Sequence, residues 1–135
     1  MSYKDGNARS DYESYIPVLK GLGKPKAWIS ENNSKILIAK VCDPLGKTLS
    51  RDVKTSQIRK FLNEVQALAI TPRVEKIPLI KAKLAYAAGR NYNLKGFYDV
   101  MAYAMDEVAD VEDIVGFREL LLGTVAYHKY YGGKE

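Results

Sequence analysis

The chain has 135 residues and a formal net charge of +5, and this length is sufficient for one domain. Its hydrophobic fraction of 47% is typical of a globular protein and not of a disordered one. A single cysteine, Cys42, and a single histidine, His128, exclude an intrachain disulfide and a cysteine-based zinc site. No apolar run reaches the roughly 18 residues of a membrane span, and no secretory signal is visible, so we expect a cytoplasmic protein without membrane contact.

The charge is divided unevenly along the chain. Residues 47–95 carry eleven basic and three acidic side chains, a net charge of +8, whereas residues 96–135 carry three basic and eight acidic ones, a net charge of −5. Residues 1–46 contribute a net charge of +2. A basic middle indicates a polyanionic partner, although a solvated basic helix face would account for the charge equally well.

The N-terminal part is rich in glycine and proline and has little apolar periodicity. We therefore expect a flexible leader over residues 1–30 and a helical domain over residues 31–135. Residues 34–42 are ambiguous, because Ile36, Ile38 and Val41 are β-branched and favour a strand. Everything that follows has helical spacing, so a lone strand would have no partner. A helix that stops at Asp43-Pro44 is the better prediction.

The next two helices have clear boundaries. Thr55 or Ser56 can cap the first of them, and Thr71-Pro72 ends it, because the residue before a proline is pushed out of the helical region. The second covers residues 79–91 and is apolar on most of its circumference, which places it near the centre of the molecule. Charged side chains in such a helix need an acidic partner or an anionic ligand.

The last two helices, over residues 94–108 and 114–131, have the three-and-four spacing of antiparallel bundles. Gly132-Gly133 stops the second of them. The sequence therefore predicts an all-α fold, a compact antiparallel bundle of about five helices. Acidic residues crowd the junction of these two helices, where they suit a helix N-terminus: Asp106, Glu107, Asp110, Glu112 and Asp113.

No constellation in the sequence supports catalysis. The paired carboxylates, Asp106 with Asp110 and Glu112 with Asp113, lie at helix ends without a histidine nearby, which favours a structural role over acid–base or metal chemistry. His128 follows a core-facing position and is expected to be a packing residue. No glycine-rich phosphate loop has the required spacing. We expect no enzyme activity, no cofactor and no metal.

The basic middle of the chain instead has the character of a phosphate-binding region. Spread positive charge binds polyphosphates because neutralising them releases condensed counterions, and Tyr86 and Tyr92 are interleaved with that charge. The helix over residues 79–91 is too apolar to be the recognition helix of a helix-turn-helix. The sequence therefore favours sequence-independent backbone binding over base readout.

Three segments carry a resemblance to a known family. They are residues 55–61 (TSQIRKF), residues 81–90 (KAKLAYAAGR) and residues 126–130 (AYHKY). In order, spacing and total length, residues 36–131 resemble the small-subunit family of type III-A CRISPR effector complexes, the Csm complex.

The resemblance implies a compact all-α protein without nuclease activity. Several copies would line the interior of the effector filament, beside its backbone subunits, and would support the duplex of guide RNA and target RNA. The implied partners are guide RNA, target RNA, the other effector subunits and further copies of the chain itself.

By position in the matching segments, the best phosphate-contact candidates are Arg59, Lys83 and Arg90. Weaker candidates lie at the helix start or in the loop before it: Arg51, Lys54 and Lys60. An alternative for Arg59 and Arg90 is a buried ion pair with the acidic cluster. For the whole protein, the alternatives are a helical protein–protein adaptor or dimeric regulator that binds no nucleic acid, and a DNA-binding regulator.

Overall fold

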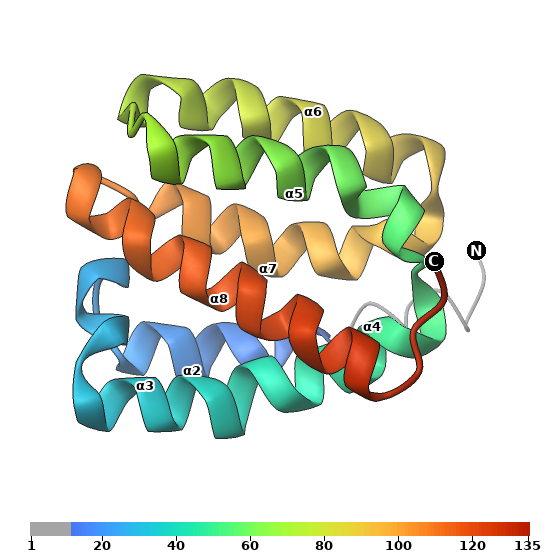
Figure 1. The fold of residues 1–135 in the computed structure, drawn as a ribbon, viewed down its shortest axis with the longest axis horizontal. Helices are drawn as coiled ribbons and strands as arrows, with labels where there is room; N and C mark the ends of the chain where they lie inside the picture. Colours follow the sequence, from blue (N-terminus) through green and yellow to red (C-terminus); the bar gives the residue numbers. More distant parts are fainter. Residues whose placement is uncertain (1–11) are drawn as a thin grey trace.

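The computed structural model describes residues 12–135, and every regular element within that range is helical, as predicted (Figure 1). In chain order the elements are α2 (Tyr15–Gly21), the 3-10 turn η1 (Pro25–Ile29), α3 (Glu31–Leu37), the π turn η2 (Ile38–Cys42), α4 (Asp43–Asp52), α5 (Thr55–Ile70), the 3-10 turn η3 (Val74–Lys76), α6 (Ile77–Arg90), the 3-10 turn η4 (Tyr92–Leu94), α7 (Lys95–Asp106) and α8 (Val111–Tyr130).

The long helix α8 runs through the middle of the molecule. Figure 1 shows α5 and α6 side by side along one edge, α2, α3 and α4 along the opposite edge, and α8 between them. α8 packs against α4, η1, η2, α5 and α7. At its centre, Phe117 is fully buried, and the ring of Phe61 meets the rings of Phe97 and Phe117 edge-on at 5.9 and 6.3 Å. Aromatic pairs of this geometry stabilise a core beyond their buried area.

The segment expected to be a flexible leader is, from residue 12 onward, part of the bundle. Leu19 and Trp28 are fully buried, and the indole Nε1 of Trp28 donates a hydrogen bond to the Gly23 carbonyl at 3.0 Å. η1 lies so close to α8 that a methyl group on Gly116 would overlap the Pro25 carbonyl. A 3-10 turn of five residues is too short to show helical periodicity. Residues 1–11 of the expected leader lie outside the described residues.

The helix predicted over residues 34–42 is present, but Asp43-Pro44 does not end it. The chain continues from α3 through η2 into α4 as far as Asp52. In η2 the Asp43 N–H donates to the Ile38 carbonyl, five residues back. A proline inside an α-helix clashes with the carbonyl four residues before it, and the wider π turn directly before Pro44 relieves that clash.

The helix predicted over residues 79–91 is present as α6, but its predicted central position is wrong. Among residues 12–135, α6 packs mainly on neighbouring α5, α7 and the two flanking turns, and Leu79 and Tyr86 on its outer side are 60% and 68% exposed. Its buried face consists of Ile77, Ile80, Leu84 and Ala88. Small residues account for the error, because they can stand in a helix without being buried. Alanine favours a helix through its propensity alone, and both Ala82 and Gly89 face solvent.

The tail after α8 turns back onto the start of α5. Gly132 adopts φ +85°, and the Gly133 N–H donates to the His128 carbonyl at 2.8 Å. Lys134 and Glu135 then accept hydrogen bonds through their backbone oxygens from the first N–H groups of α5, at 2.8 and 2.7 Å. α5 begins at Thr55, so the predicted side-chain cap at Thr55 or Ser56 is replaced by this tail. His128 is buried, as predicted, with its Nε2 2.7 Å from the Val53 carbonyl oxygen.

Candidate nucleic-acid interface

The six predicted phosphate-contact residues are all exposed on the surface: Arg51, Lys54, Arg59, Lys60, Lys83 and Arg90. They lie at the end of α4, at the junction after it, on α5 and on α6. The structure therefore does not bury Arg59 or Arg90, and neither pairs with the acidic cluster within residues 12–135.

Four of these residues gather at one end of the molecule. Arg51 and Lys54 line a shallow polar hollow of about 470 Å³ together with Lys134. The Asn93 side-chain amide donates to the Asp52 carbonyl at 2.6 Å and to Gln57 Oε1 at 3.1 Å, which holds the chain just after α6 against the start of α5. We call this region the basic end; it comprises Arg51, Lys54, Arg59, Arg90 and Lys134.

The tail also places a carboxylate at the basic end. Glu135 accepts from Arg59 Nη2 at 3.1 Å and from Lys129 Nζ at 2.9 Å. These side chains are 55% to 67% exposed, so the pairs contribute little to stability. The hydrogen bond from Lys129, with Arg59 beside it, holds the pKa of the Glu135 carboxyl below its usual range. Glu135 is therefore ionised at neutral pH and competes with any anion that approaches Arg59.

The two candidates on α6 have different surroundings. Lys83 forms an ion pair with Glu64 of α5 at 2.7 Å. The Arg90 guanidinium lies 5.8 Å from the centre of the Tyr86 ring, and within residues 12–135 it forms no ion pair. A cation over an aromatic face keeps its charge available to solvent and is held in position by the ring. Of the two, Arg90 is the cation better placed to meet a phosphate.

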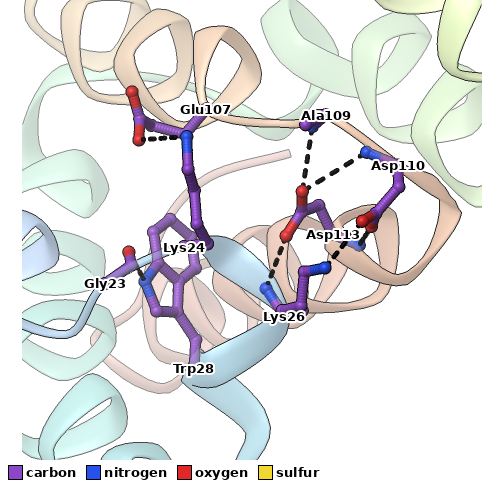
Figure 2. Close-up of polar contacts among 8 residues, drawn as sticks. All are labelled: Gly23, Lys24, Lys26, Trp28, Glu107, Ala109, Asp110 and Asp113. Atoms are coloured by element: carbon purple, nitrogen blue, oxygen red, sulfur yellow. Dashed lines mark hydrogen bonds and ion pairs between the residues drawn. The ribbon is translucent and has the colours of Figure 1, made fainter.

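The acidic cluster between α7 and α8 is largely neutralised by lysines that the sequence analysis did not pair with it. Three ion pairs join it to distant segments, and Figure 2 includes the first two: Lys24–Glu107 at 3.2 Å, Lys26–Asp110 at 2.6 Å and Lys81–Asp106 at 2.7 Å. The hydrogen bond from Lys26 lowers the pKa of the Asp110 carboxyl below its usual range. These carboxylates fasten the N-terminal segment and α6 to the α7–α8 corner.

Asp113 is the buried member of this cluster. Its carboxylate is fully buried and accepts backbone N–H bonds from Lys26 at 2.9 Å, Ala109 at 2.9 Å and Asp110 at 3.3 Å (Figure 2). Three donors satisfy the buried charge and join η1 to the N-terminus of α8. The cluster thus has the structural role that the sequence favoured over catalysis.

The opposite end of the α5–α6 layer exposes two large aliphatic side chains among charged ones, a feature that sequence reasoning missed. Ile70 is 85% exposed and Leu79 is 60% exposed. Leu79 lines a second hollow of about 470 Å³, whose walls include Leu68 and Ile80 and the charged side chains of Glu64, Arg73, Lys76 and Lys83. Large exposed aliphatic side chains beside a hollow are typical of a protein-contact surface.

Within residues 12–135, no helix is long and apolar enough to cross a bilayer. No three side chains of the metal-ligating types come together there either.

The fold and this surface define a small all-α protein with an exposed basic end and a neutralised acidic corner. Residues 32–134 match the family model described as Csm2 Type III-A, and all three segments of the resemblance lie inside that range. The chain therefore belongs to the Csm2 family, the small subunits of type III-A CRISPR complexes, as predicted.

A curated relative supports the same assignment. The chain is 30% identical over 90 residues to the CRISPR system Cms protein Csm2 of Streptococcus thermophilus, an overlap of 60% of this chain and 74% of that protein. No solved structure matches the chain.

Proposed function

We propose that this small subunit is non-catalytic, acts in the cytoplasm and supports the duplex of guide RNA and target RNA through contacts with the sugar–phosphate backbone, without reading sequence. The observation that carries the proposal is the exposure of all six candidate cations, with four of them gathered at the basic end. In RNA-guided systems base pairing reads the sequence, so the protein needs only to recognise charge and shape.

The physical chemistry of an RNA duplex fits such a surface. The major groove of A-form RNA is too deep and narrow for side chains to read, so proteins contact its phosphates and 2′-hydroxyls. Exposed arginine and lysine side chains supply the contacts to phosphates.

The proposal also includes a part in filament assembly. Support comes from the exposed aliphatic side chains of Ile70 and Leu79, which lie at the far end of α5 and α6 from the basic end. One layer would then contact RNA at one end and a neighbouring subunit at the other.

The direct test is binding of the purified chain to labelled RNA oligonucleotides of unrelated sequence, measured by fluorescence anisotropy at several salt concentrations. We expect weak binding without sequence preference, with log affinity falling against log salt by about 0.7 for each phosphate contacted on a single strand. Absence of binding even at low salt would support a pure assembly role. A strong preference for one duplex DNA sequence would support a DNA-binding regulator.

Arg90→Glu is expected to weaken RNA binding by about tenfold at low salt, because it replaces a phosphate contact by a repulsive charge. The melting curve followed by circular dichroism should stay unchanged, since Arg90 is exposed and forms no ion pair within the described residues. Lys35→Glu, an exposed substitution on α3, is the matched control for net charge. Equal losses in both variants, or a lowered melting temperature for Arg90→Glu, would contradict a direct contact.

Glu135→Gln is expected to raise RNA affinity by about two- to fivefold, because it removes the negative charge that competes for Arg59 and Lys129. The gain should shrink as salt is added, since salt screens exposed charges. Glu13→Gln, at another exposed glutamate, supplies the control in the same anisotropy titration. If Glu135→Gln left the RNA affinity unchanged, Arg59 would not be part of the RNA interface.

A further inference from the structure

The last turn of α8 carries a cluster of three tyrosines that the proposed backbone contacts do not use. Tyr130 is 76% exposed, and its ring lies 5.0 Å from that of Tyr131 and 6.1 Å from that of Tyr127, measured between ring centres. Both ring pairs are nearly perpendicular, at 78° and 77°. Most of the Tyr130 ring surface is therefore open to a ligand.

The rings around Tyr130 are themselves held in place. Tyr127 is half-buried and packs against the core. The Tyr131 hydroxyl donates a hydrogen bond to Asp43 of α4, and this bond raises the pKa of Tyr131 to about 12, so the hydroxyl stays protonated at neutral pH. Tyr130 thus stands on a fixed support, which lowers the entropic cost of using it as a binding platform.

Cations surround this cluster and connect it to the basic end. Lys47 Nζ lies 5.7 Å from the centre of the Tyr131 ring, and Lys129 directly precedes Tyr130 in the chain. Lys129 and Arg59 both form ion pairs with the Glu135 carboxylate, so this carboxylate links the tyrosine cluster to the basic end. An exposed aromatic ring beside a positively charged surface is the arrangement that single-stranded nucleic acids bind.

We infer that Tyr130 stacks against an unpaired base of single-stranded RNA whose phosphates lie along Lys47, Lys129 and the basic end. The inference rests on the proposed RNA binding and adds to it a preference for unpaired bases. A base inside a duplex has both faces covered by its neighbours, so the Tyr130 ring is of use only to a strand that is not paired. Stacking is tolerant of sequence, because every base has an aromatic face.

The test measures binding of the full chain to an unstructured 20-nucleotide RNA and to the same RNA paired with its complement, by fluorescence anisotropy. Tyr130→Ala and Tyr130→Leu should each weaken binding to the single strand by at least about fivefold. Tyr130→Phe, which keeps the ring, should bind within about twofold of the original chain. Binding to the duplex should not change, and neither should the salt slope, because stacking releases no counterions.

A strand with abasic sites adds a second readout. The original chain and Tyr130→Ala should bind it equally, because it offers no base to stack. Suppose that the original chain binds RNA and that Tyr130→Ala and Tyr130→Leu bind the single strand with the same affinity. The stacking role is then wrong and the proposed function stands. Equal losses on single strand and duplex would also overturn stacking and would point to a general contact. If the original chain binds no RNA at low salt, the proposed function itself fails.

Discussion

Replacing Trp28 by alanine is expected to lower the free energy of unfolding by about 3–5 kcal/mol, the usual cost of removing a fully buried large aromatic side chain. The indole Nε1 bond to the Gly23 carbonyl is lost as well. A domain of this size has a total stability of about 5–15 kcal/mol, so the midpoint of urea unfolding should fall markedly.

The matched control for this variant is Ile29→Ala in the same turn, η1. Ile29 is 47% exposed, so its truncation should cost less than about 1 kcal/mol. If Trp28→Ala unfolded at the urea midpoint of the original chain, residues 12–30 would behave as the loose leader that the sequence suggested. The comparison therefore tests whether the N-terminal segment belongs to the cooperative core.

Replacing Arg51, Lys54 and Arg59 together by glutamine is expected to weaken single-stranded RNA binding by more than about tenfold at 0.1 M salt. The salt slope should fall in magnitude by about 2, since each phosphate contact on a single strand contributes about 0.7. All three side chains are exposed, so circular dichroism should give an unchanged melting temperature. The measurement is the anisotropy titration at four or more salt concentrations.

The control removes the same charge away from the basic end, with glutamine at Lys20, Lys35 and Lys40, which are exposed on α2, α3 and η2. A local interface predicts a small loss of affinity and an unchanged slope for this second variant. Equal losses in the two triple variants would mean that RNA senses only the net charge, and the basic end would have no special role.

The sequence was sufficient to predict the all-α fold and most of the helices from residue 31 onward. α7 is the clearest example, because Phe97, Met101 and Met105 recur at helical spacing and are all buried. Periodicity is a local signal, and these helices have one face on the core and one in solvent.

The errors arise where contacts between distant residues decide the structure. Trp28 is buried by packing against α8, and the turn that holds it has no period to detect. Pro44 is tolerated because a π turn precedes it. The start of α5 is capped by a tail almost 80 residues further along the chain. None of these features is encoded in a window of neighbouring residues.

The exposure of the six candidate side chains could be predicted from the sequence, but their ion pairs could not. Arginine and lysine side chains at a helix end are normally exposed, and the structure exposes all six. Their partners are distant in sequence: Glu64 lies 19 residues from Lys83, and Glu135 lies 76 residues from Arg59. Which of these cations form ion pairs therefore depends on the fold.

The close contact between α4 and α8 fixes the spacing between the tyrosine cluster and the cations beside it. A methyl group on Gly46 would lie 2.8 Å from the Thr124 carbonyl oxygen and from the His128 nitrogen, so the two backbones touch at this glycine. α4 carries Lys47 and Arg51, and α8 carries Tyr130. The spacing between the Tyr130 ring and these cations is therefore rigid, and in the proposed binding an oligonucleotide would have to adjust its own path to fit it.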